Sequence, residues 1–167
     1  MTLASLAVAC TAQTTISTPL GDVLLARTEA GLAGAWFTGQ KAHPIAIAAP
    51  RRDDDPLLRA AVSQLGEYFA DQRQKFDLTL DMRGTEFQRQ VWRALLGIAR
   101  GQTASYGDIA RQIGSPSAVR AVGAAVGRNP LSVIVPCHRV VGSDGSLTGY
   151  AGGLERKRAL LHLEGVP

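Results

Sequence analysis

Apolar and polar residues alternate along positions 14–37 in three short runs. These runs are T-T-I-S-T, V-L-L-A-R-T and L-A-G-A-W-F, and they are separated by P-L-G-D and E-A-G, which are typical turn sequences. The pattern predicts a β-meander. Residues 75–81 (K-F-D-L-T-L-D) also alternate and predict a further strand, while the apolar stretch 3–10 predicts a buried first strand. Residues 38–54 show no periodicity and predict a loop.

Helical spacing of apolar residues follows several helix-start signals. Asp55-Pro56 is an N-cap followed by proline in the first turn, and apolar residues recur at helical spacing through position 69. Thr85 with Gln88, and Ser105 with Asp108, form capping boxes. We expect helices from 56 onward, from 85 to a stop at Gly101, from 105 to 113, from 117 to about Gly127 after the turn at 114–116, and over 154–163.

The two kinds of pattern divide the chain at residues 82–84. We predict an α/β (α+β) protein with an N-terminal structural domain over 1–81, made of a strand meander plus a helix. Residues 82–167 are then a mainly helical domain. Its two helices joined across 114–116 (G-S-P) have the spacing of a helix-turn-helix, here of the winged-helix kind. Many helix pairs pack in this way without contacting DNA.

Charge is distributed unevenly between these halves. The chain of 167 residues has a net charge of +4, but residues 1–81 hold 7 Lys and Arg against 9 Asp and Glu, whereas residues 82–167 hold 11 against 5. A basic half suggests a polyanionic partner such as nucleic acid. The alternative is a GC-rich genome, since 15 of the 18 basic residues are arginine.

The predicted fourth helix has an unusual composition. Its sequence S-A-V-R-A-V-G-A-A-V-G has one long side chain, Arg120, and is otherwise built of small residues. Such a helix either packs tightly against a neighbour or enters a narrow space such as the minor groove of DNA, which is about 6 Å wide. Helices that read the major groove normally carry several long polar side chains.

Cysteine usage and the N-terminus bear on the compartment. Only Cys10 and Cys137 are present, which is too few for a disulfide framework and indicates a reducing environment. The sequence A-V-A-C at 7–10 loosely resembles a lipoprotein cleavage site, but no basic residue precedes it. No apolar run reaches the length of a membrane span. We therefore expect a cytoplasmic protein that does not bind membranes.

Cys137 is the residue with the most reactive surroundings. A free cysteine is often a small buried hydrophobe. Here it follows a predicted short strand, L-S-V-I-V at 131–135, and precedes His138 and Arg139, whose charges are expected to favour the thiolate. Glu164 lies where it could orient a histidine, which completes the parts of an activated nucleophile. Because neighbouring side chains on an extended segment point apart, Cys137 and His138 require a turn or a bridging water to communicate. Metal-ligand spacing and phosphate-binding glycine patterns are not found.

The motif P-C-H-R-V at 136–140 resembles the active site of the O6-alkylguanine-DNA alkyltransferases. Further motifs of that family follow in order over residues 82–165, namely S-Y-G at 105–107, R-A-V-G at 120–123, N-P at 129–130, Y-A-G-G at 150–153 and L-E-G at 163–165. The resemblance over the first 80 residues is limited to the order of elements and a T-P-L-G turn.

The resemblance implies a role for each matching residue. Cys137 accepts the alkyl group, His138 deprotonates it through a water molecule, and Glu164 orients His138. Asn129 holds the turn around the acceptor, and Tyr106 donates a hydrogen bond to N3 of guanine. The remaining substrate contacts come from Val140, Tyr150, Ala151 and Gly152. Ala151 stands where many members have serine, so only its amide can reach the guanine O6, which bears on the pocket's tolerance for larger alkyl groups.

DNA binding is implied by the same resemblance. A base inside a duplex must be extruded before its alkyl group can react, and an inserted side chain offsets part of the cost. Arg120 is the expected inserted residue, and Arg128 is expected to contact phosphate. The other expected contacts to the minor groove are Ser105, Ala118, Ala121, Gly123 and Ala124.

These observations predict a monomeric, cofactor-free and metal-free DNA repair protein. It transfers an alkyl group irreversibly from O6-alkylguanine, and from O4-alkylthymine, in double-stranded DNA to Cys137, once per molecule. Two alternatives stay open at this point. One is a cysteine hydrolase, which turns over, and the other is an alkyltransferase-like protein that binds lesions without repairing them.

Overall fold

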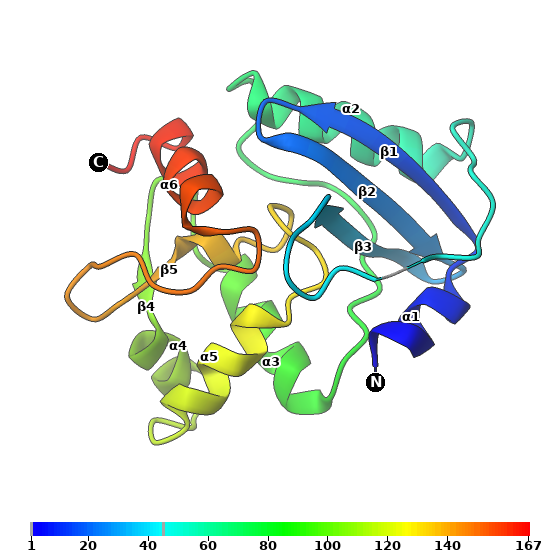
Figure 1. Cartoon of the computed structure of the whole chain (residues 1–167). Coiled ribbons are helices and arrows are strands. Elements are labelled where there is room, and N and C mark those ends of the chain that lie inside the picture. The colour runs from blue at the N-terminus through cyan, green and yellow to red at the C-terminus, as the bar shows by residue number, and fades with distance from the viewer. Residues whose placement is uncertain (1, 45) are drawn as a thin grey trace. The chain divides into compact units, whose positions relative to one another are not determined.

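The computed structural model describes residues 2–44 and 46–167. The chain forms two compact units, residues 1–83 and 84–167. Unit 1 contains a three-stranded antiparallel sheet in the order β1-β2-β3, formed by β1 (Ala12–Thr18), β2 (Gly21–Thr28) and β3 (Gly31–Phe37). This is the predicted meander, and Figure 1 shows it with its tight turns.

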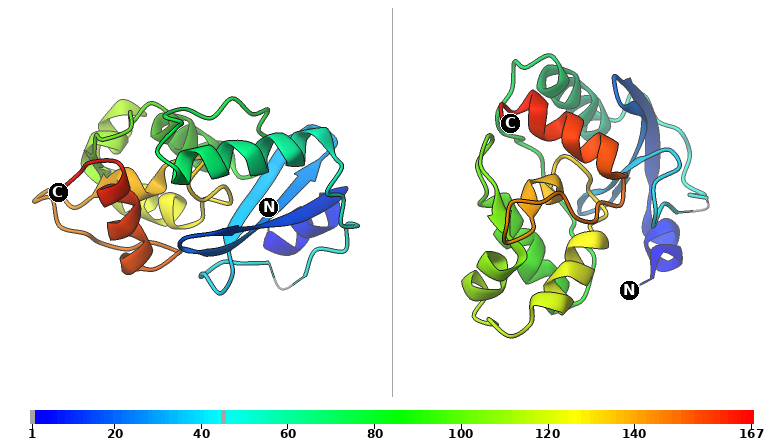
Figure 2. Two further views of the ribbon diagram at one scale, coloured as in Figure 1. Left: turned by 90° about the horizontal axis from the view of Figure 1, so that it is seen from above. Right: turned by 60° about the vertical axis from the view of Figure 1, so that its left-hand side comes forward.

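Both faces of this sheet are covered. Helix α2 (Pro56–Phe69) contacts all three strands along one face, and its N-cap Asp55 accepts hydrogen bonds from two backbone amides, as predicted. Helix α1 (Leu3–Ala9) and residues 46–49 pack against the other face, where Trp36 is fully buried (Figure 2). The seven residues of β3 are all buried for this reason. The Trp36 ring folds over Gly34, where any Cβ would lie 1.8 Å from it.

Two strand predictions in unit 1 are wrong. Residues 3–9 are helical, because Thr2 and Ser5 form a capping box and the segment is rich in alanine and leucine, which favour helix. Residues 75–81 are extended but pair with β3 only at the bridge between Leu32 and Leu80. Their alternating side chains correctly indicate alternating burial, but a ladder with β3 does not form.

Unit 2 begins with three helices that contact one another. They are α3 (Glu86–Leu96), α4 (Tyr106–Gln112) and α5 (Val119–Gly127), and both predicted capping boxes are present. Helix α3 ends at Leu96 with Gly97 as its C-cap, so Gly101 does not stop it as predicted. Gly101 instead lies in the turn after α3 with φ +79°, and a Cβ at this position would lie 3.2 Å from the carbonyl oxygen of Glu164. The last helix is α6 (Leu154–Leu163), as predicted.

The segment between α5 and α6 carries the reactive residues and departs from the predicted pattern. Residues 131–135 are a buried turn rather than a strand, with Val133 in the left-handed region at φ 71°. A short apolar run indicates burial but does not distinguish a strand from another buried segment. The 3₁₀ helix η1 (Cys137–Arg139) follows, and β5 (Val140–Val141) then pairs in parallel with β4 (Ala104–Ser105).

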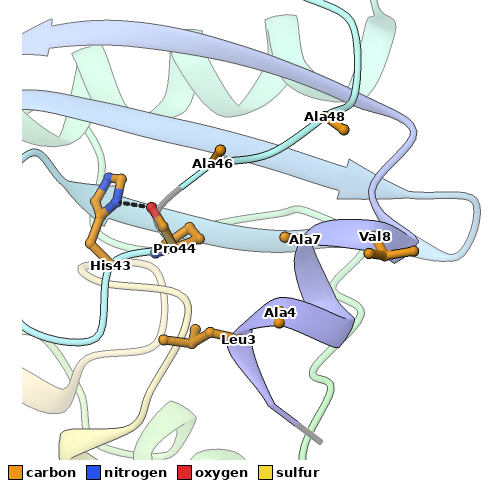
Figure 3. Close-up of a pocket in the computed structure, with 8 residues that line it drawn as sticks. All are labelled: Leu3, Ala4, Ala7, Val8, His43, Pro44, Ala46 and Ala48. Carbon is orange, nitrogen blue, oxygen red and sulfur yellow. Dashed lines mark hydrogen bonds between the residues drawn. The ribbon is translucent and has the colours of Figure 1, made fainter.

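Unit 1 also has an apolar groove of about 500 Å³ between α1 and residues 43–44 and 46–48 (Figure 3). It is lined by Leu3, Ala4, Ala7, Val8, His43, Pro44, Ala46 and Ala48, and the His43 Nδ1 lies 2.6 Å from the carbonyl of Pro44. No described helix is long and apolar enough to span a membrane.

Candidate active site

The Cys137 thiol lies at the start of a tight turn that a buried asparagine holds in place. The Asn129 amide nitrogen donates to the Val135 carbonyl at 2.9 Å and to the Cys137 sulfur at 3.1 Å. Its amide oxygen accepts from the Leu131 N–H at 3.0 Å. One side chain therefore supports the 131–135 turn and fixes the sulfur. Cys137 is only 4% exposed and does not lie on an open strand edge.

Three buried side chains form a connected network beside the thiol. The His138 Nε2 lies 2.8 Å from Oε1 of Glu164. Arg139 donates from Nε to Oε2 and from Nη2 to Oε1 of the same carboxylate, each at 2.9 Å. The 3₁₀ turn resolves the problem of adjacency, because Cys137 and His138 are not on an extended segment. The structure thus brings the predicted histidine and glutamate together, in the turn that begins with the predicted cysteine.

Burial sets the protonation states of this network. Burial raises the pKa of the Cys137 thiol, against the lowering effects of the Asn129 hydrogen bond and the Lys157 charge. Burial also lowers the pKa of His138, against the raising effect of Glu164. The expectation that basic neighbours favour the thiolate is therefore wrong for the resting protein, in which thiol and imidazole are both neutral. A proton must move when the reaction occurs.

The position of that proton acceptor follows from the hydrogen bonds of the imidazole. Because Nε2 faces an acceptor-only carboxylate, it carries the ring proton, and Nδ1 keeps its lone pair. Nδ1 of His138 is buried and has no hydrogen-bond partner among the residues the structure describes. It is therefore the ring nitrogen that is able to accept a proton.

A buried lysine joins two segments around the thiol. Nζ of Lys157 donates to the carbonyl of Val140 at 2.5 Å and to that of Thr148 at 2.7 Å. Burial lowers the pKa of Lys157 to about 8. The Tyr106 hydroxyl also donates to the Thr148 carbonyl, at 3.3 Å. One carbonyl therefore connects Lys157 with the tyrosine that the sequence places near the substrate.

The remaining expected substrate residues lie in the segment that follows Thr148 and on β5. Val140 is fully buried, Tyr150 and Ala151 are half-buried, and Gly152 is buried. A Cβ at Gly152 would lie 2.6 Å from the Tyr150 ring, so glycine allows this ring to fold back over the loop.

The expected DNA contacts occur on α5 and at the start of α4. Val122, Ala125 and Val126 form the buried side of α5, whereas Arg120, Ala121 and Ala124 are exposed. Arg128 is exposed just beyond the helix. Ala118, Ser105 and Gly123 are half-buried, and Gly123 lies against the Tyr106 ring. Small residues therefore occupy both sides of α5, which leaves Arg120 as its one long side chain.

Sequence reasoning missed the roles of Arg139 and Lys157 in this network. A signal for Lys157 is present, because positions 157, 160, 161 and 164 are one helical face, and the structure buries all four. No comparable pattern indicates the pairing of Arg139 with Glu164. Among the described residues, no group of His, Cys, Asp and Glu side chains could hold a metal ion.

Comparisons with known proteins cover both units. Residues 12–82 match the family model of the 6-O-methylguanine DNA methyltransferase ribonuclease-like domain, and residues 86–166 match that of the DNA binding domain. A methylated-DNA–protein-cysteine methyltransferase of Mycobacterium tuberculosis is 50% identical over 151 residues, 90% of each chain. One from Methanosarcina acetivorans is 48% identical over 88% of this chain and 94% of its own.

Solved structures agree with these relatives. The crystal structure of Mycobacterium tuberculosis OGT in complex with DNA superimposes with a TM-score of 0.83 at 48% identity over 92% of each chain. The O6-methylguanine-DNA methyltransferase of Pyrococcus kodakaraensis has a TM-score of 0.54 at 25% identity, over 93% of this chain and 99% of its own. With both family models matched and half of the aligned residues identical to those of a relative, the chain belongs to the methylated-DNA–protein-cysteine methyltransferases.

Proposed function

We propose that this protein repairs alkylated DNA directly, by moving a methyl or other small alkyl group from O6 of guanine to the sulfur of Cys137. The observation that carries this proposal is the buried set of Cys137, His138 and Glu164, in which the His138 Nε2 lies 2.8 Å from the carboxylate. The set provides a nucleophile, a base and a group that orients the base.

The reaction is a balanced substitution at one carbon atom. The thiol proton of Cys137 passes through a water molecule to Nδ1 of His138, and the resulting thiolate attacks the alkyl carbon. A carbon–sulfur bond forms as the carbon–oxygen bond to guanine breaks. The electron pair of that bond stays with the base, and the proton that His138 took up returns to the base, so the products are the thioether and unmodified guanine. The product is a thioether, which does not hydrolyse, so each molecule reacts once.

The resting state fits this chemistry. A buried neutral thiol is protected from unwanted reactions, and it becomes nucleophilic only when the proton leaves. Tyr106 supports departure of the base by donating a hydrogen bond to N3 of guanine. For this donation its hydroxyl must leave the Thr148 carbonyl that it contacts in the free protein.

The pocket for the base is proposed to lie between two segments. The main chain of Cys137 and Val140 recognises the exocyclic amine, Tyr150 forms a wall, and the amides of Ala151 and Gly152 face O6. Because Ala151 has no hydroxyl, only its amide can face O6, and this position bears on how large an alkyl group the pocket tolerates. We propose O4-alkylthymine as a second substrate.

DNA binding is proposed to use α5 in the minor groove. The exposed side of this helix carries small residues that permit close approach, and Arg120 is long enough to replace an extruded nucleotide. The excess of 11 basic over 5 acidic residues in positions 82–167 favours binding to phosphates. The crystallised relative from Mycobacterium tuberculosis is itself in complex with DNA.

We further propose that the protein acts in the cytoplasm, as a monomer and without a cofactor. The substitution needs only a thiol, a base and an alkylated oxygen. Its two cysteines are both free, which fits a reducing compartment. The division of labour between residues 1–81 and 82–167 is proposed to be structural support for the first and DNA binding with alkyl transfer for the second.

Intact-mass spectrometry after mixing with an oligonucleotide that contains O6-methylguanine tests the proposal. Repair predicts a permanent gain of one methyl group, located on the peptide that contains Cys137. An unchanged final mass with continued loss of substrate would instead identify a cysteine hydrolase. A shifted gel band with no change in mass would identify a protein that only binds the lesion.

A further inference from the structure

The carboxylate of Glu164 is shared by two donors from the same turn. Its Oε1 receives the His138 Nε2 at 2.8 Å and the Arg139 Nη2 at 2.9 Å, while Oε2 receives the Arg139 Nε at 2.9 Å. The guanidinium therefore grips both oxygens, in the planar two-point geometry that arginine provides and lysine does not. The side chains of His138 and Glu164 have no exposed surface, and that of Arg139 is 8% exposed.

Arg139 is itself fixed from a third direction. Its Nη1 donates to the carbonyl of Ile98, just after α3, at 2.6 Å. The guanidinium thus connects the end of α3, the η1 turn and the end of α6. Because Arg139 binds both carboxylate oxygens, the carboxylate of Glu164 cannot rotate relative to the imidazole without breaking this two-point hydrogen bond, which we call the fork. The imidazole of His138 is therefore held in one orientation, and this fixes the direction in which the Nδ1 lone pair points.

We propose that Arg139 is a positioning residue of the transfer reaction, which fixes Glu164 and thereby keeps His138 neutral, protonated at Nε2 and ready to accept a proton at Nδ1. Arg139 acts through Glu164 and does not touch the alkylated base. This inference rests on the proposed function, because it assigns the arginine to the proton transfer that activates Cys137.

Charge acts in the same direction as geometry. The charged groups that act on His138 are Lys157 from α6, Glu164 at its C-terminal cap, and Arg139 from the η1 turn, where the Cys137 thiol is the adjacent titratable group. Burial is the largest cause of the lowered pKa of His138, Glu164 opposes it, and the positive charges of Arg139 and Lys157 add to it. Without the guanidinium, the negative charge of Glu164 favours a second proton on the imidazole more strongly, so the pKa of His138 rises. A doubly protonated histidine cannot act as the base.

The test compares Arg139→Met, Arg139→Lys and the wild type in single-turnover methyl transfer. The protein is mixed with a saturating oligonucleotide that carries one O6-methylguanine, and the rate of methyl gain is followed by mass spectrometry over about pH 5 to 8. Arg158→Met is the matched control, because it removes an exposed arginine from the other side of α6. Thermal unfolding shows which variants are folded.

We expect Arg139→Met to shift the acidic limb of the rate profile upward by about one pH unit, a roughly tenfold loss of rate on that limb. Arg139→Lys retains the charge but not the fork, so its limb stays in place while its plateau rate falls by about tenfold. Nitrogen NMR of labelled histidine should report the neutral Nε2-protonated form of His138 in the wild type. Arg158→Met should follow the wild type.

A folded Arg139→Met variant with the wild-type profile would overturn the inference. If Arg139→Met does not fold, Arg139→Lys provides the test. A plateau rate of methyl transfer and a histidine NMR spectrum equal to those of the wild type would show that Arg139 has no positioning role. These results are distinct from failure of the proposed function, in which the wild-type protein itself gains no methyl group.

Discussion

Replacement of Asn129 by alanine is expected to destabilise unit 2 and to slow the reaction. The Asn129 side chain is 4% exposed and serves three partners around the acceptor turn. Without it, the N–H of fully buried Leu131 loses its acceptor. The Val135 carbonyl keeps one donor, the Cys137 N–H at 2.8 Å, so it loses a bond but is not left unpaired.

The size of the effect follows from these two losses. An unsatisfied buried N–H costs about 1–3 kcal/mol, and a lost hydrogen bond to a carbonyl that keeps another donor costs about 0.5–1.5 kcal/mol. The sum predicts a loss of about 1.5–4.5 kcal/mol in the free energy of unfolding, a large share of the roughly 5–15 kcal/mol that stabilises a typical domain.

Urea denaturation followed by tryptophan fluorescence measures this loss of stability for unit 2 separately from unit 1. The two tryptophans are divided between the units, with Trp36 in β3 and Trp92 in α3, where the indole of Trp92 donates to the Ala125 carbonyl at 2.9 Å. In a Trp36→Phe background, Trp92 fluorescence reports unit 2 alone. The midpoint should fall while the slope stays constant.

A neighbouring substitution provides the control. Arg128→Ala removes an exposed side chain next to Asn129 and should change the stability by less than about 0.5 kcal/mol. If Asn129→Ala unfolds within that same margin of the wild type, the amide does not support the 131–135 turn. The rate of methyl transfer is a second readout, because loss of the amide donor further raises the pKa of the Cys137 thiol.

Three further predictions concern DNA and pH. Arg120→Ala should slow repair of duplex DNA far more than transfer from the free alkylated base, as measured by methyl gain, and an equal loss with both substrates would exclude an inserted side chain. Cys137→Ser should still bind DNA in gel-shift titrations, with an affinity that falls steeply as salt rises, whereas a flat salt response would contradict binding through phosphates. Stability should fall as pH drops below the ordinary histidine pKa of 6.5, because the pKa of His138 is lowered in the folded state and the unfolded chain then binds the extra proton. His138 contributes up to about 1.4 kcal/mol per pH unit to the change of unfolding free energy with pH. Urea titrations at several pH values should therefore show a weaker pH dependence of the unfolding free energy for His138→Gln than for the wild type, and an equal dependence would contradict the assignment.

The sequence by itself determined those elements that local signals encode. Capping boxes at Thr85 and Ser105, and the turn sequences of the meander, act over a few residues, so α3, α4 and the three strands could be predicted. The motif around Cys137 indicated the family and its chemistry. The helix at 3–9 was missed because a short apolar run carries no decisive period.

Tertiary structure decided the environment of the reactive groups. His138 and Glu164 are 26 residues apart in sequence, and only the packing of α6 against the η1 turn brings them within 2.8 Å. The protonation states depend on burial, which for the pKa of the Cys137 thiol outweighs the Asn129 hydrogen bond and the Lys157 charge. The fork of Arg139 on Glu164 likewise exists only in three dimensions, because hydrogen bonds between distant residues depend on how helices pack and leave no periodic trace along the chain.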